Sequence, residues 1–100
     1  MSKRVSHKNI DKNIDRFIQL GIVISTLRKI KGMSQEQLAA EANISRSLLG
    51  MIEAPNVAHC FSLEVFFDLA DALDISPTDL IEASVFPDKI INKNKEKTQK

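Results

Sequence analysis

The spacing of apolar residues along this chain predicts helices and no strands. In residues 12–31 apolar side chains recur mostly at helical intervals, at Ile14, Phe17, Ile18, Leu20, Ile24, Leu27 and Ile30. Shorter segments with similar patterning cover residues 35–42, 46–53, 63–73 and 77–83, and polar residues separate them. Few Gly and Pro residues and the absence of Trp and Tyr agree with this pattern. We therefore predict a compact all-α fold of five helices.

Residues that start and stop helices mark the same boundaries. Ser34 suits an N-cap, and Gln37 three residues later completes a capping box. Asn43 suits the left-handed conformation that ends a helix, and Gly32 tolerates such a stop after residue 31. Further caps are predicted at Ser45, at Ser62 and at Ser76, which is followed by Pro77.

The two short helices 35–42 and 46–53 pack face to face in this interpretation. Their core-facing residues are expected to be Leu38, Ala39, Ala42, Ile44, Leu49 and Ile52. Arg46, Ser47, Gly50 and Met51 then share the opposite face of the second helix, because such offsets place residues on one side. Two short helices joined by a tight turn form a helix-turn-helix, whose second helix can lie in the DNA major groove.

This stretch resembles the helix-turn-helix of phage-repressor and Cro-like transcription regulators, the XRE family. The residues that carry the resemblance are Leu27-Arg28, Met33-Ser34-Gln35-Glu36, Leu38-Ala39, Ile44-Ser45-Arg46-Ser47, Leu49 and Ile52-Glu53. The likeness extends over residues 20–83, with residues 62–84 resembling the family's last two helices. It implies a lambda-repressor-like domain with the helix-turn-helix at helices 2 and 3.

The resemblance also implies roles for individual residues. Gln35 would contact a phosphate or a base, and Ser45 would combine a cap with a phosphate contact. Arg46 and Ser47 would face base edges, Arg46 either binding guanine bidentately or binding phosphate only. The remaining implied positions are Gly50 and Met51 in the groove, Asn56 in the following loop, and a structural salt bridge between Arg28 and Glu53.

Two regions depart from the family pattern. The loop after Glu53 offers only Asn56 and His59, where the family more often has Gly and basic residues that contact phosphate. Gly50 and Met51 stand where the family usually has polar or basic side chains. Met51 and the nearby Leu48 suit either thymine methyl groups or another protein.

The charge distribution is uneven although the formal net charge is only +1. Residues 1–31 contain eight Lys/Arg and two Asp/Glu, residues 32–88 contain one and ten, and residues 89–100 contain five and one. Phosphate contacts are thus expected from the basic ends and from helix N-termini. We divide the chain into a flexible basic arm (1–10), the helix-turn-helix domain (11–84) and a partly disordered Lys-rich tail (85–100). The arm is either a solvated tail or an extra DNA contact.

Several other classes of protein are disfavoured. The single Cys60 cannot form an intrachain disulfide, so a reducing cytoplasm is expected, and Cys60 is interpreted as a small packing residue. His59 and Cys60 lack partners at metal-ligand spacing. No apolar run is long enough to span a membrane, and no catalytic constellation occurs. We expect no enzyme activity, cofactor or metal.

The leading hypothesis is a sequence-specific regulator of transcription, a repressor that binds double-stranded DNA as a homodimer. Dimer contacts are expected from helix 77–83, from residues 86–91, or from Phe17 and Ile18, which otherwise cap the core. One alternative is a protein-interaction module that keeps the fold but binds DNA weakly. Another is the DNA-binding antitoxin of a toxin–antitoxin pair.

Overall fold

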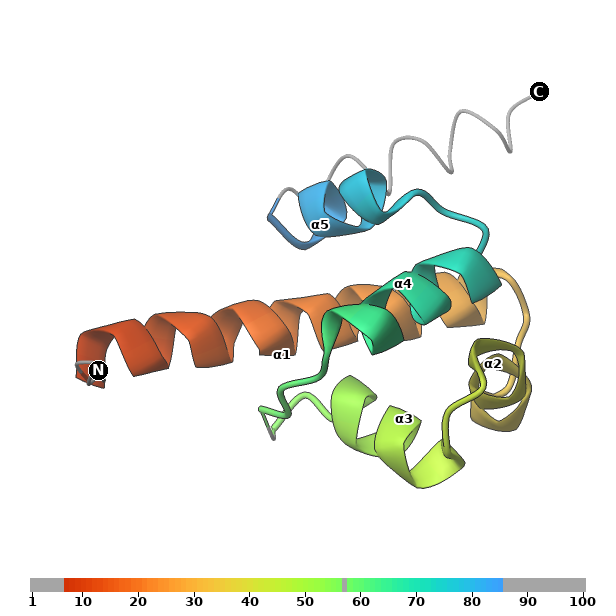
Figure 1. The fold of residues 1–100 in the computed structure, drawn as a ribbon, viewed down its shortest axis with the longest axis horizontal. Helices are drawn as coiled ribbons and strands as arrows, with labels where there is room; N and C mark the ends of the chain where they lie inside the picture. The colour runs from red at the N-terminus through yellow and green to blue at the C-terminus, as the bar shows by residue number, and fades with distance from the viewer. Residues whose placement is uncertain (1–6, 57, 86–100) are drawn as a thin grey trace.

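A computed structural model describes residues 7–56 and 58–85 of the chain. Within those residues it contains five helices and no strand (Figure 1). The helices are α1 (His7–Ile30), α2 (Gln35–Ala42), α3 (Arg46–Glu53), α4 (Leu63–Ala72) and α5 (Pro77–Val85). The predicted five-helix all-α fold is confirmed, and no described helix has the length and apolar content needed to cross a membrane.

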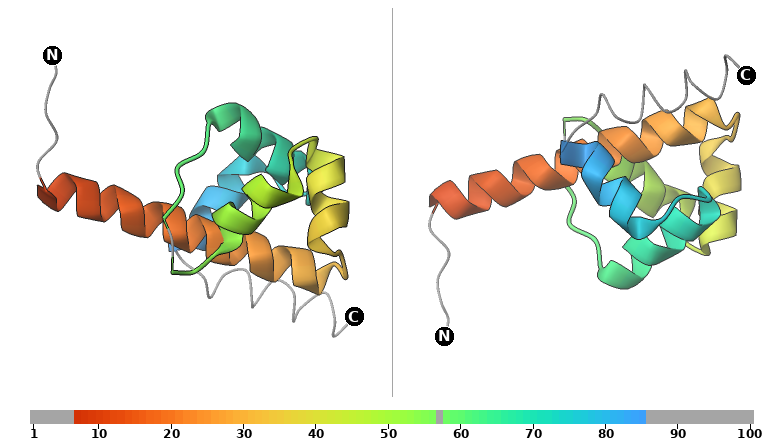
Figure 2. Two further views of the ribbon diagram at one scale, coloured as in Figure 1. Left: turned by 90° about the horizontal axis from the view of Figure 1, so that it is seen from below. Right: turned by 90° about the horizontal axis from the view of Figure 1, so that it is seen from above.

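The first and last helices are longer than predicted. α1 starts at His7 rather than at residue 12, so the last four residues of the predicted arm are helical. No Gly or Pro lies between His7 and Asp11, and Asn and Asp are only mildly unfavourable inside a helix, so nothing stops it earlier. The N-terminal half of α1 projects beyond the other helices (Figures 1 and 2). α5 runs to Val85, one residue past the predicted domain boundary. The rest of the predicted arm and tail lies outside the described residues.

Serine side chains start four of the helices, as predicted. The Ser34 hydroxyl accepts a hydrogen bond from the Gln37 backbone N–H (3.0 Å), and the Gln37 side chain accepts one from the Ser34 N–H (2.8 Å). The hydroxyls of Ser45, Ser62 and Ser76 accept in the same way from the residue three positions later. Each contact satisfies a backbone N–H that the first turn of a helix leaves without a partner.

Three helices end in the same way, at a residue with left-handed backbone. Gly32 (φ 73°), Asn43 (φ 58°) and Asp74 (φ 56°) follow α1, α2 and α4. The next residue is apolar each time and packs against the core; these residues are Met33, Ile44 and Ile75. The predictions for Gly32 and Asn43 are confirmed. The tight turn at Asn43 fixes the direction in which α3 leaves α2.

All five helices contribute buried side chains to one core. Its largest fully buried side chains are Ile24, Leu38, Leu49, Leu69, Leu73 and Leu80. Small buried residues at Ala39 and Ala42 let α2 pack closely against its neighbours. α3 packs on one side of α1 and α5 on the other (Figure 1).

Some apolar residues in the helical segments are exposed. Ile14 and Ile30 of α1, Leu63 and Phe67 of α4 and Ile81 of α5 all face solvent, with Leu63 reaching 69% exposure. The reason is geometric, because adjacent residues such as Leu80 and Ile81 cannot both face the core of a one-sided helix. Cys60 is also exposed, so its interpretation as a packing residue is wrong.

Phe17 covers one edge of the core. Its half-buried ring meets Phe61 edge to face, with the ring centroids 5.2 Å apart. Phe61 itself packs against the buried cluster. The contact therefore favours the core-capping role over the dimer role for Phe17.

Candidate nucleic-acid interface

Helix α3 buries one face and exposes the other. Leu49, Ile52 and Glu53 are buried, whereas Arg46, Ser47 and Met51 are exposed and Gly50 is half-buried. The four outward positions lie on one side of the helix, since they are one, three, four or five residues apart. The outward face of α3 thus carries the guanidinium of Arg46, the hydroxyl of Ser47 and the thioether of Met51. Gly50 adds no side chain to this face.

The first turn of α3 places its polar side chains at the open end. The Ser45 hydroxyl accepts a hydrogen bond from the Leu48 N–H at 3.0 Å and remains exposed. Arg46 follows directly and is the only Lys or Arg between residues 32 and 88. A guanidinium on the outside of a helix can form the bidentate contact with guanine that major-groove recognition uses most often.

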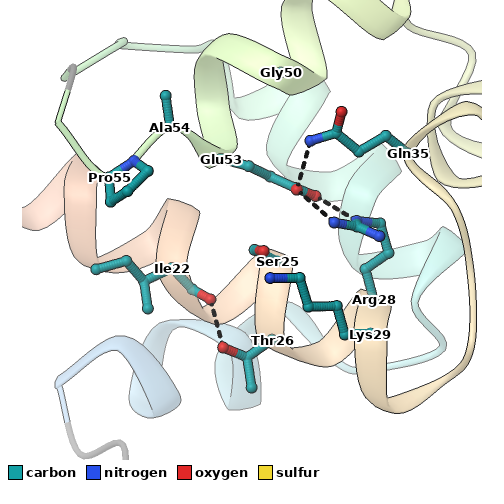
Figure 3. A pocket seen from close by; sticks show the side chains of 10 residues that line it. All are labelled: Ile22, Ser25, Thr26, Arg28, Lys29, Gln35, Gly50, Glu53, Ala54 and Pro55. Atoms are coloured by element: carbon teal, nitrogen blue, oxygen red, sulfur yellow. Dashed lines mark hydrogen bonds and ion pairs between the residues drawn. The ribbon is translucent and has the colours of Figure 1, made fainter.

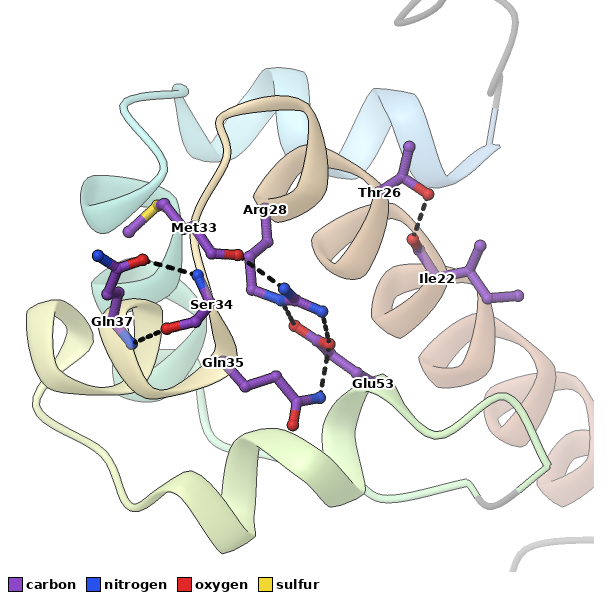
Figure 4. A network of polar contacts seen from close by, with 8 residues as sticks. All are labelled: Ile22, Thr26, Arg28, Met33, Ser34, Gln35, Gln37 and Glu53. Atoms are coloured by element: carbon purple, nitrogen blue, oxygen red, sulfur yellow. Dashed lines mark hydrogen bonds and ion pairs between the residues drawn. The ribbon is translucent and has the colours of Figure 1, made fainter.

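The last turn of α3 is held by a buried ion pair. Arg28 Nε and Nη2 donate to the two carboxylate oxygens of Glu53, at 2.9 and 3.0 Å (Figure 4). Arg28 Nη1 also donates to the Met33 carbonyl oxygen at 2.8 Å. Hydrogen bonding to Glu53 raises the pKa of Arg28 above its ordinary value, against the opposing effect of burial. The hydrogen bonds of Arg28 link α1, the turn before α2, and α3.

Gln35 joins this network, which the sequence did not indicate. Its side-chain Nε2 donates to Glu53 Oε1 at 2.9 Å, and its carbonyl oxygen points away from Glu53 (Figure 4). The contact of Gln35 with a phosphate or a base stays a prediction. The structure shows a half-buried amide that is held by Glu53, the residue that anchors α3.

Gly21 allows the close approach of α1 to the end of α3. A Cβ atom added at Gly21 would overlap the backbone carbonyl oxygen of Ile52 and would also touch the Glu53 backbone. Because both neighbouring groups are backbone, neither can rotate aside. No role for Gly21 was predicted from the sequence, although a glycine inside an otherwise apolar helix is a sign of close helix packing.

The loop after α3 lies at the opposite end of that helix from Arg46 and Ser47. Asn56 is exposed and follows the C-terminal end of α3, whereas Arg46 and Ser47 are at its start. His59 is half-buried and Cys60 is exposed. The described residues contain no group of three or more His, Cys, Asp or Glu side chains arranged to hold a metal ion.

A surface pocket of about 550 Å³ lies between α1 and α3 (Figure 3). It is lined by Ile22, Ser25, Thr26, Arg28, Lys29, Gln35, Gly50, Glu53, Ala54 and Pro55. Two of the residues predicted to bind DNA, Gln35 and Gly50, stand at its edge. Lys29 and Ser25, to which no binding role was assigned, line the same space.

Comparisons with known proteins agree with this architecture. The helix-turn-helix family model matches residues 24–80. The solved structure of the restriction-modification controller protein C.AhdI from Aeromonas hydrophila is similar, with 38% identity and a TM-score of 0.59, over 64% of this chain and 94% of that chain. The wild-type restriction-modification controller protein C.Esp1396I has 26% identity and a TM-score of 0.63, over 70% of this chain and 88% of that chain. No curated protein matches.

Proposed function

The chain belongs to the XRE-type helix-turn-helix family of DNA-binding transcriptional regulators, and we propose that it reads its DNA site with Arg46 and Ser47 of α3. The observation that supports this is the division of α3 into an anchored end and an exposed end. Buried contacts at Glu53 hold the helix in place, while the side chains of Arg46 and Ser47 at its start are exposed. A rigidly held helix with an outward guanidinium suits insertion into the major groove.

We further propose that it controls the genes of a restriction–modification system. C.AhdI, a controller protein of such a system, is 38% identical, and the likeness covers 94% of its chain. The proposal predicts that selected DNA sites map upstream of neighbouring restriction or methyltransferase genes in the source genome. Sites that map only to unrelated promoters would contradict it.

A homodimer on a two-fold DNA site is the assembly that we propose. Ile81 and Val85, one turn apart on α5, are 46% and 62% exposed. α5 lies on the far side of α1 from α3, so pairing through α5 leaves the recognition surface open (Figure 1). Two copies would then place their α3 helices about 34–36 Å apart, one turn of DNA. Light scattering with and without DNA should show a dimer, and Ile81→Lys should shift it to monomer.

One observation favours a second function, a protein-binding surface on the same fold. Met51 is 43% exposed on α3, and residues 32–88 contain ten acidic residues and one basic residue. In that case DNA binding would be weak and independent of sequence. We propose this protein-binding surface as the alternative function. For both functions we propose a cytoplasmic location and no catalytic activity.

The deciding experiment measures fluorescence anisotropy on a selected duplex and a scrambled duplex at two salt concentrations. For a DNA reader, Arg46→Ala should cost about 1–3 kcal/mol on the selected duplex and relax the preference at one base pair. Lys31→Ala is the control, because Lys31 is an exposed cation to which no DNA or dimer contact is assigned. Equal affinity of the wild type for both duplexes, unaffected by Arg46→Ala, would contradict the proposal and favour the protein-binding surface.

A further inference from the structure

The recognition surface has too few cations for a protein that binds a polyanion. Arg46 is the only Lys or Arg between residues 32 and 88, and Arg28 is occupied by Glu53. A helix in the major groove has phosphates on both sides, since the groove is only about 12 Å wide. Further positive charge beside α3 must therefore come from residues before 32 or after 88.

Lys29 on α1 supplies a cation next to α3. Its exposed side chain extends along the α1 wall of the pocket toward Ser25 (Figure 3). Gln35 from α2 and Gly50 from α3 complete the rim. α1 thus brings an ammonium and a hydroxyl, and α2 an amide, to one open space beside Gly50 of α3, at the edge of the recognition surface.

The acidic residue in the pocket does not oppose an anion strongly. Both carboxylate oxygens of Glu53 accept hydrogen bonds from Arg28, and one also accepts from Gln35. The Glu53 side chain is almost fully buried. Its charge is therefore compensated, and the Lys29 ammonium is the charge that remains available to a ligand.

Gly50 keeps the α3 wall of the pocket open. A Cβ at this position would meet no atom within 4 Å, and the backbone is not left-handed, so the fold itself does not need a glycine here. Glycine is nevertheless unfavourable inside a helix compared with alanine. A ligand that approaches this wall closely would explain why residue 50 is a glycine.

We propose that this pocket is a subsite for a backbone phosphate of duplex DNA, with Lys29 as the neutralising cation. Ser25 and Gln35 are neutral donors at the same subsite. The inference rests on the proposed DNA-reading function and adds a residue that fixes the position of the DNA without reading its sequence. Lys29 thus replaces the basic residues that the loop after α3 lacks.

The test compares Lys29→Gln with Lys31→Gln. Both remove one exposed positive charge near the end of α1, but Lys31 does not line the pocket. The plot of the logarithm of DNA affinity against the logarithm of salt concentration has a negative slope. In Lys29→Gln the magnitude of this slope should be smaller by about 0.9, the value for one phosphate contact. The slope should stay unchanged in Lys31→Gln. An unchanged slope in Lys29→Gln, or equal losses in both variants, would overturn the subsite.

Two further measurements separate the possible failures. If the wild type prefers the selected duplex and Lys29→Gln keeps the full slope, the subsite is wrong and the proposed function stands. If the wild type shows no preference but Lys29→Gln still flattens the slope, the subsite stands and sequence reading fails. Addition of inorganic phosphate at constant ionic strength tests whether the pocket binds a free anion instead of DNA. A rise in melting temperature that Lys29→Gln abolishes, with an unchanged DNA slope, would assign the pocket to free phosphate and overturn the proposal.

Discussion

The two ends of α3 differ in almost every physical respect. At the C-terminal end, Ile52 and Glu53 are buried. Glu53 accepts hydrogen bonds from Arg28 and Gln35, and the backbone of Ile52 lies close to Gly21. At the N-terminal end, Arg46 and Ser47 are exposed, and the Ser45 hydroxyl accepts the capping hydrogen bond from the Leu48 N–H. One eight-residue helix therefore combines a rigid attachment with an open surface.

This difference separates stability from recognition along one helix. Substitutions at the attached end should act on folding and only indirectly on DNA. Substitutions of the outward side chains Arg46 and Ser47 should act on DNA binding and little on folding, whereas the Ser45 cap at the same end contributes to stability.

Breaking the ion pair should have the largest effect. Arg28→Ala or Glu53→Ala leaves one buried charge without its partner and should lower the free energy of unfolding by about 3–5 kcal/mol. Urea unfolding followed by circular dichroism measures this. Replacing both residues, as Arg28→Met with Glu53→Leu, should cost less than either single change. Unchanged unfolding in both single variants would show that the pair does not anchor α3.

Gly21→Ala should be the next most damaging change. The added methyl group overlaps the Ile52 carbonyl, so α1 and α3 must separate, at a cost of about 1–3 kcal/mol. The unfolding midpoint in urea should fall accordingly. Gly50→Ala is the matched control, because its added methyl group meets nothing. Equal effects of the two substitutions would disprove the close approach.

At the open end, Ser45→Ala should cost about 0.5–2 kcal/mol of stability through loss of the N-cap. Ser47→Ala is the control, since its exposed hydroxyl caps no helix. Thermal unfolding of the two variants would separate capping from surface polarity. A larger loss in Ser47→Ala than in Ser45→Ala would reverse the assignment.

The smallest expected effect on stability has the opposite sign. Gly50→Ala should stabilise the fold by about 0.5–1 kcal/mol, because alanine suits a helix interior better and has room here. DNA affinity should fall at the same time, since the methyl group narrows the approach to α3. Parallel unfolding and anisotropy measurements test both effects. A gain in stability with unchanged affinity would mean that DNA does not use this gap.

The sequence predicted the parts of this structure that depend on neighbouring residues. Helical spacing, the serine caps and the left-handed Asn43 each involve residues within four positions, so they can be recognised along the chain. The outward face of α3 followed from the same periodicity. The assignment of Arg28 and Glu53 came from family resemblance, because no local pattern connects residues 25 positions apart.

Tertiary structure decided the features that depend on distant residues. Only the folded chain shows that Gln35 bonds to Glu53, that Gly21 touches Ile52, and that Lys29 and Gly50 border one pocket. It also decided that the apolar side chains of Phe67 and Ile81 face solvent. The reason is that helical periodicity fixes which residues share a face, whereas the position of neighbouring helices determines which face is covered.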